Sequence, residues 1–203
     1  MKRTLATFLA LVLAPALALA EASTWNLDPA HSHASFTIRH LVISNVRGDF
    51  QKMSGAVKLD DKDVTKSSVE ATIETASIDT RIAKRDEDLR SENFFDAAKY
   101  PAITFKSKKI EKAGKDKLKV TGDLTMHGVT RPVVLQVNAP ATEVKDPWGN
   151  TRRGFSASTK LNRKDFGLTY SKTIEAGPVV GDEVTIEIEG ELIKQAGDTT
   201  AGK

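Results

Sequence analysis

The sequence predicts an all-β protein whose eight strands close into an antiparallel β-barrel, with a short helical insert near residues 80–100. Apolar and polar residues alternate along most of the chain, which is the period of half-buried strands. Sequences typical of tight turns separate these runs into hairpins. One stretch, residues 79–101, lacks the alternation. A barrel is favoured over an open sheet because closure leaves no unpaired strand edges.

Each predicted strand carries its apolar residues on one face. In the first strand, Ala34, Phe36 and Ile38 alternate with polar residues. The eight predicted strands are residues 32–40, 53–59, 69–73, 103–107, 118–126, 133–137, 155–161 and 184–192. Residues 113–116 and 127–130 have compositions that predict two tight hairpin turns. Residues 44–48 are interpreted as a link and residues 162–183 as an irregular stretch.

The insert is predicted to form two short helices with a break between them. Asp79 or Thr80 suits the N-cap of the first helix, Ser91 suits that of the second, and Pro101 ends the segment. Its apolar residues are Leu89, Phe94 and Phe95. A short amphipathic segment covers an apolar surface, so we expect it to close one mouth of the barrel above a functional cavity. The alternative, that it plugs a packed core, stays open.

The first twenty residues have the features of a secretory signal peptide. Lys2 and Arg3 precede an apolar run over residues 5–16, and a small-residue cleavage site ends at Ala20, with a second one at Ala22. We therefore expect an exported protein. The expected organisation is a signal peptide at residues 1–20 (or 1–22), a barrel domain at 21–194 and a disordered tail at 195–203.

The composition argues against several classes of function. The formal charge of +3 falls by two when the basic residues of the leader are removed, which leaves no basic surface for nucleic acid. No apolar run after the leader is long enough to span a membrane. Since the chain has no cysteine, its core must hold the fold without disulfides. No nucleophile motif, phosphate loop or dinucleotide fingerprint occurs, so the sequence predicts neither an enzyme nor a cofactor.

The inward-facing residues predict space inside the barrel. Large apolar residues there are interspersed with small ones, namely Ala34, Gly55, Ala71, Gly122, Ala157 and Gly190. Small side chains at so many inward positions leave unfilled apolar space, which favours an elongated hydrophobic ligand over a solid core. The alternative is that the glycines mark β-bulges and bends of the barrel.

Two histidines, His31 and His33, lie two residues apart, so that both could face a metal from one side of a strand. A metal site needs further ligands close to them, and no carboxylate cluster adjoins the other histidines. We interpret the histidines as structural or surface residues and predict no metal site.

Several motifs resemble those of a known family. They are Trp25-x-Leu27-Asp28-Pro29-x-His31-Ser32, the run from Gly122 to Pro132, and Arg163-Lys164-Asp165-Phe166-Gly167-Leu168. In this order they are similar to motifs of the YceI-like family. The resemblance implies an extended, lipocalin-like barrel of eight strands around an elongated hydrophobic pore, in a periplasmic or secreted protein that is often dimeric. It also implies binding of polyisoprenoids or other long-chain amphiphiles, and it implies no catalytic residue.

The leading hypothesis is a periplasmic protein that sequesters or carries a polyisoprenoid or other long-chain amphiphilic lipid inside the barrel. We expect the lipid tail to contact Phe36, Ile38, Phe105, Leu124, Phe155 and Phe166. We expect an anionic head group to contact His40, Arg47 and Arg131.

Two rival hypotheses remain at this point. In the first, the protein is an accessory of membrane electron transfer or stress response that uses an isoprenoid quinone or a weak metal site at His31 and His33. In the second, a solidly packed barrel acts through a partner surface. The expected partners are a long-chain isoprenoid or fatty amphiphile and a second copy in a homodimer, without nucleic acid.

Overall fold

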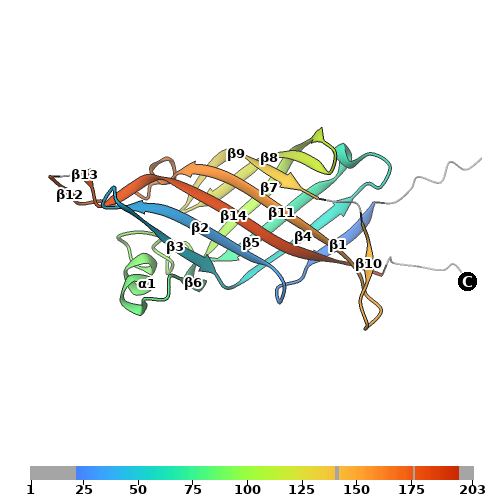
Figure 1. Ribbon diagram of the computed structural model, residues 1–203, viewed down its shortest axis with the longest axis horizontal. Coiled ribbons are helices and arrows are strands. Elements are labelled where there is room, and N and C mark those ends of the chain that lie inside the picture. Colours follow the sequence, from blue (N-terminus) through green and yellow to red (C-terminus); the bar gives the residue numbers. More distant parts are fainter. Residues whose placement is uncertain (1–21, 140–141, 176, 197–203) are drawn as a thin grey trace, which may run out of the picture.

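The computed structural model describes residues 22–139, 142–175 and 177–196, and these form an elongated barrel (Figure 1). The predicted signal peptide and most of the predicted tail lie outside the described residues. The first strands are β1 (Ser23–Leu27), β2 (His33–His40), β3 (Ser44–Phe50), β4 (Met53–Leu59), β5 (Ser68–Glu74) and β6 (Ile78–Asp79). The later strands are β7 (Ala102–Gly114), β8 (Lys117–Met126), β9 (Val129–Asn138), β10 (Val144–Lys145), β11 (Thr151–Asn162), β12 (Thr173–Ile174), β13 (Gly177–Pro178) and β14 (Val180–Lys194). The helices are α1 (Ala83–Arg90) and the 3₁₀ turns η1 (Val64–Lys66), η2 (Thr75–Ser77) and η3 (Arg163–Phe166).

The strands close into the predicted antiparallel barrel of eight. The ring runs β11-β9-β8-β7-β5-β4-β1-β14, and β14 returns to β11. Strand β14 pairs along one edge with β11, and along the other with β2 and then β1. Strands β1 and β2 therefore act as one interrupted strand, as do β3 and β4. The interpretation of residues 44–48 as a link is wrong, because they belong to β3 and pair with β2.

The two predicted hairpins are confirmed. Strands β7 and β8 meet at a turn in which Gly114 and Asp116 have φ of 141° and 56°. Between β8 and β9, His127 and Gly128 have φ of 51° and 74°. Two successive residues at positive φ form the turn whose twist suits a hairpin. A side chain on Gly128 would also come within 2.6 Å of the ring of Tyr100. Glycine is therefore required at this position both by the positive φ and by this close contact.

The prediction of two helices in the insert is wrong, because α1 is the only α-helix among the described residues. Residues beyond Ser91 fold back on the end of α1 in a series of turns. The backbone N–H groups of Phe94 and Asp96 both donate to the Ser91 carbonyl, and Asp96 has a φ of 44°. A left-handed residue ends a helical path, so the second helix cannot form.

Helix α1 begins without the predicted cap. Its N-cap is Ile82, which offers no side-chain oxygen. Instead the Asp86 carboxylate reaches back and accepts hydrogen bonds from the backbone N–H and the hydroxyl of Thr80, at 2.8 and 2.5 Å. At the other end, Arg90 donates to the carbonyls of Ala76 and Ile78. These bonds tie both ends of α1 to the segment that leads into it.

Residues 162–183 are more ordered than predicted, since they contain η3, the β12–β13 hairpin and the start of β14. Arg163 organises this segment from the inside. It is buried, and its guanidinium donates to backbone carbonyls that include those of Gly181 and Tyr170. Burial lowers the pKa of Arg163, against the attraction of Asp182. The donors of Arg163 are thus engaged by the protein's own backbone, so few of them are free to hydrogen-bond a ligand.

The barrel has two different ends (Figure 1). We call the one with α1, η3 and the β12–β13 hairpin the helix end. We call the other, where both ends of the described chain and the β10–β11 hairpin lie, the terminal end. The tightly buried cluster of the core is made of Phe50, Ile78, Ile103, Phe105, Ile110, Val120, Met126, Val133, Phe166 and Leu168. Leu89 and Phe95 of the insert pack against this cluster, so the insert covers an apolar surface as expected.

Candidate functional site: a cavity inside the barrel

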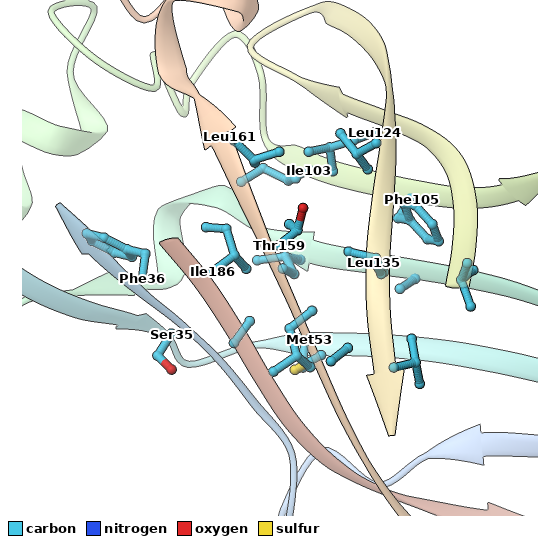
Figure 2. A pocket seen from close by; sticks show the side chains of 18 of the residues that line it. Ser35, Phe36, Met53, Ile103, Phe105, Leu124, Leu135, Thr159, Leu161 and Ile186 are labelled. Atoms are coloured by element: carbon cyan, nitrogen blue, oxygen red, sulfur yellow. The ribbon is translucent and has the colours of Figure 1, made fainter. Parts of the chain in front are cut away.

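The barrel encloses a cavity of about 790 Å³. Its lining comes from strands all around the ring and from the insert, which contributes Leu89, Phe94 and Phe95. Figure 2 shows side chains from different strands converging on this space, among them Phe36, Phe105 and Ile186. The wall is largely aliphatic and aromatic. A volume of this size is within the range of pockets that hold small organic ligands.

Three phenylalanines lie flat against glycines of the neighbouring strand. Phe36 is the register partner of Gly48, and Phe155 that of Gly190. A side chain on either glycine would come within about 2.7 Å of the facing ring. An aromatic ring that covers a cross-strand glycine fills the gap in the wall. Each ring therefore lies along the wall instead of crossing the lumen.

The third such glycine, Gly122, would bring a side chain within 2.5 Å of the Phe105 ring. It also lies opposite a register shift in β7 between Ser107 and Lys109. Small inward residues therefore leave space for a ligand at some positions, and at others they accompany a β-bulge or a covering aromatic ring. Of the six small residues predicted to face inward, four line the cavity, namely Ala34, Gly55, Ala71 and Ala157.

Five of the six residues proposed for the lipid tail line the cavity, namely Phe36, Ile38, Phe105, Leu124 and Phe155. The expected position of Phe166 is corrected, because this residue is 2% exposed, belongs to the core cluster and does not line the cavity. Strand β11 ends at Asn162 and the 3₁₀ turn η3 follows, so the alternation of the strand does not extend to Phe166. Sequence reasoning did not select Leu135 and Ile186, which also line the cavity and have the same alternation.

The residues proposed for the head group divide in the same way. His40 lines the cavity at the helix end. Arg47 does not, because Val46 lines the cavity and its neighbour in the strand must face outward. Arg131 is exposed at the start of β9, and its Nε donates to the Asp165 carbonyl at 3.2 Å. Positions near a rim thus do not by themselves bring an arginine to the cavity.

Other cations do line the cavity at the helix end, but their donors are engaged. Arg39 donates to the Val42 carbonyl and to Asn45. Arg85 donates to the hydroxyl and the carbonyl of Thr80. His40 also lines the cavity, and its ring takes part in none of the hydrogen bonds found among the described residues.

An arginine that the sequence analysis did not select lines the cavity at the terminal end. The Arg153 guanidinium lies 4.9 Å from the ring centroid of Trp25, which is completely buried. Its Nη2 pairs with Glu143 at 2.7 Å, and this hydrogen bond lowers the pKa of Glu143. The Lys194 ammonium lies 5.2 Å from the same ring. The signal for Arg153 was its place two residues before Phe155 on the inward face of the strand.

The His31 region is an ion network and not a paired-histidine site. Ligand atoms of Asp28, His31 and Glu191 lie within 4.8 Å of one another, and His33 is not part of this group. Arg152 bonds to both carboxylates and also to Asp146. A guanidinium already supplies the positive charge that a metal would bring. This geometry speaks against the metal version of the rival hypothesis.

The network shifts the pKa values of its carboxyls. Hydrogen bonds from Arg152 and His31 lower the pKa of Asp28 to about 2. Burial alone would raise the pKa of Asp146, but hydrogen bonds from Arg152 and Asn150 outweigh it and hold that pKa at about 2. Both carboxylates therefore stay charged through the neutral and mildly acidic range.

A sequence model of the YceI-like domain matches residues 25–192. The chain belongs to the YceI-like family. It is 38% identical over 192 residues to a UPF0312 protein of Vibrio parahaemolyticus, an alignment that covers 93% of this chain and 96% of the relative. The barrel fold and the membership of the YceI-like family were thus correctly predicted from the motifs in the sequence.

Solved structures show the same fold. BcnA of Burkholderia cenocepacia superposes with a TM-score of 0.72 at 28% identity, over 81% of this chain and 98% of that one. A polyisoprenoid binding domain from Saccharophagus degradans, implicated in plant cell wall breakdown, superposes with a TM-score of 0.63 over 84% of this chain and 98% of that one. At 17% identity the second likeness shows the fold alone. In the described part of this chain, no helix is long and apolar enough to cross a membrane.

Proposed function

We propose that this YceI-like protein acts in the periplasm and sequesters or carries a polyisoprenoid or other long-chain amphiphilic lipid, with the lipid chain inside the barrel. The observation that carries the proposal is the apolar cavity of about 790 Å³ within the ring of strands. Export is supported by the signal peptide predicted at residues 1–20. The choice of lipid class is motivated by the binding named for the Saccharophagus degradans domain.

The wall supplies the binding free energy in this proposal. Each buried methylene contributes about 0.8 kcal/mol, so a chain of ten carbons gains about 8 kcal/mol before the cost of ordering it. The binding free energy that remains after this cost is sufficient for a measurable affinity without any special polar contact. Phe36, Phe105 and Phe155 contribute rings that are already held flat by their glycine partners, so little side-chain freedom is lost on binding.

The head group is proposed to lie at the helix end, beside His40. Arg153, which lines the cavity at the terminal end, is already paired with Glu143, whereas the His40 ring takes part in none of the hydrogen bonds found among the described residues. Binding is the whole of the proposal, which requires no catalytic group.

Native mass spectrometry of the mature protein, purified from cells that export it, tests the proposal. A stoichiometric long-chain adduct that is released on denaturation, and is identified after organic extraction, is the expected result. A quinone in the extract would instead favour the electron-transfer hypothesis. A clean apo mass, with no uptake of added prenyl phosphates, quinones or fatty acids, would overturn the proposal in favour of a barrel that acts through a partner surface.

A further inference from the structure

Two chain segments that are far apart in sequence form an apolar tip at the helix end. One is the β2–β3 turn, residues 41–43, and the other is the β12–β13 hairpin (Figure 1). Val42, Ile43 and Ile174 are 48%, 77% and 45% exposed. The Leu41 N–H donates to the Val179 carbonyl at 2.9 Å, which holds the two segments together. Scattered exposed aliphatic residues are ordinary, but a cluster on adjoining loops marks an interaction site.

The backbone of the β2–β3 turn gives a second, independent observation. Leu41 and Val42 have φ of 51° and 65°. A turn with two residues at positive φ strongly prefers Asn-Gly, and a β-branched residue in this region is a clear outlier. The chain therefore keeps bulky aliphatic side chains at a position where they destabilise the fold. Strain of this kind is typical of residues that serve a function and not the fold.

The tip adjoins the mouth of the cavity. His40 precedes the turn and Val179 follows the β12–β13 hairpin, and both residues line the cavity. The exposed tip thus lies next to the cavity wall in the chain at two separate places. The charges beside it are mixed, with Arg39 and Lys172 as cations and Glu175 as an anion.

The shape of the tip decides between two kinds of partner. A stable protein interface engages about 20–30 residues on each side, whereas this tip offers three exposed aliphatic side chains on two projecting loops. Such a surface is too small and too convex for a second copy of the chain. It suits shallow insertion into the interface of a lipid bilayer, where aliphatic side chains enter the acyl region and flanking charges remain among the head groups.

We propose that the β2–β3 turn and the β12–β13 hairpin dock the helix end of the barrel on a phospholipid bilayer, with the mouth of the cavity facing the membrane. The exposed and strained tip alone supports the docking. The passage of lipid between bilayer and cavity, which this arrangement would serve, rests on the proposed function.

Flotation with vesicles of phosphatidylcholine and phosphatidylglycerol tests the docking. The mature wild-type protein is expected to float with the vesicles. Ile43→Ser should weaken this association about tenfold, because the side chain loses the methylenes that enter the bilayer. The triple variant Leu41→Asn, Val42→Gly, Ile43→Ser should abolish it, while its Tm stays equal or rises by about 3 °C because the strained turn is relieved.

Trp148 provides the matched control. It is 79% exposed on the β10–β11 hairpin at the terminal end, so Trp148→Ser removes an exposed aromatic ring from the opposite end of the barrel. This variant is expected to float as the wild type does. Unchanged flotation of the triple variant, or a loss in Trp148→Ser as large as in Ile43→Ser, would overturn the proposal.

Binding of a fluorescent fatty acid in vesicle-free solution separates docking from the proposed function. Unchanged binding by the triple variant, together with slower delivery of the same probe to vesicles, supports docking as a step separate from binding. If the wild type floats but binds none of the fluorescent fatty acid, a prenyl alcohol and a quinone, the proposed function fails and the docking stands. If the wild type binds the probe but does not float, the docking fails and the proposed function stands.

Discussion

The two ends of the barrel are held by different kinds of contact. At the terminal end, charged groups converge, with Arg152 bridging Asp28, Asp146 and Glu191 and with Arg153 over Trp25. At the helix end, Val42 and Ile43 expose aliphatic side chains on a strained turn. Charge networks with several partners fix a geometry, whereas strained and exposed loops do not stabilise the fold. The comparison indicates that the terminal end maintains the barrel, and the proposed function places the passage of ligand at the helix end.

The largest expected effect is that of breaking the charge network. Arg152→Ala removes the shared cation and leaves the Asp28 and Asp146 carboxylates, which are nearly buried, without their main partner. Breaking a buried pair from one side is strongly destabilising, so we expect Tm to fall by roughly 10 °C. Differential scanning calorimetry measures this. Arg47→Ala, on the outer face of β3, is the control and should leave Tm unchanged. A fall of less than about 2 °C for Arg152→Ala would show that the network does not hold this end.

Acid should loosen the same end. The pKa of Asp28 and that of Asp146 are about 2 in the fold, below the 3.8 of a free aspartic acid side chain. Because the folded pKa is lowered, the stabilisation is fully present above pH 4 and is lost as the pH falls from about 4 towards 2. Urea denaturation at several pH values should show this loss in the wild type. An equally steep decline in Arg152→Ala would mean that other carboxyls cause it.

A change in the middle of the barrel tests how the lumen is kept open. A methyl group in Gly190→Ala would come within 2.7 Å of the Phe155 ring and 2.9 Å of the Ser32 hydroxyl, so the ring must swing into the lumen. We expect a loss of about 1–3 kcal/mol in the free energy of unfolding and weaker uptake of long-chain fatty acid.

Gly154→Ala, in the same strand as Phe155, is the matched control. A side chain there meets nothing within 4 Å, so stability and uptake should stay at wild-type values. If the two variants bind ligand equally well, the flat rings do not define the width of the lumen. Denaturation and fluorescence titration provide the two measurements.

The smallest expected effect concerns the head group. His40→Ala should lower affinity for a prenyl phosphate by a factor of about ten or less, since one charged hydrogen bond is lost. Affinity for the corresponding prenyl alcohol should hardly change. Isothermal titration calorimetry compares the two ligands. If the phosphate binds the variant as tightly as the wild type, while Arg153→Ala weakens it, the head group lies at the terminal end.

Much of the barrel could be predicted from the sequence because strand alternation is a local signal. The run that contains Ala34, Phe36 and Ile38 faces the lumen as predicted, and so does that of Phe155 and Ala157. The inward position of small residues also predicted the cavity. What the alternation could not show is that Phe36 and Phe155 lie flat, since this depends on which glycine each ring meets in the neighbouring strand.

The ends of the barrel were predicted less well, for a physical reason. The charge network forms only because closure of the ring brings Arg152 next to Asp28 and Asp146. The local sequence around each of these residues does not indicate such a network. Arg47 is close to the rim in sequence but lies on the outer face. The Leu-Val pair of the β2–β3 turn contradicts the turn preference itself, so sequence rules predict a link where a strained hairpin occurs.

Photo-crosslinking with long-chain lipids that carry a diazirine tests the central claim most directly. With the diazirine at the tail, mass spectrometry should find adducts on inward residues such as Phe105, Leu135 and Ile186. With the diazirine beside the head group, adducts should appear near His40 and the insert. Head-group adducts near Arg153 would reverse the assignment of the two ends. Adducts confined to outward residues would contradict the claim that the cavity holds the lipid.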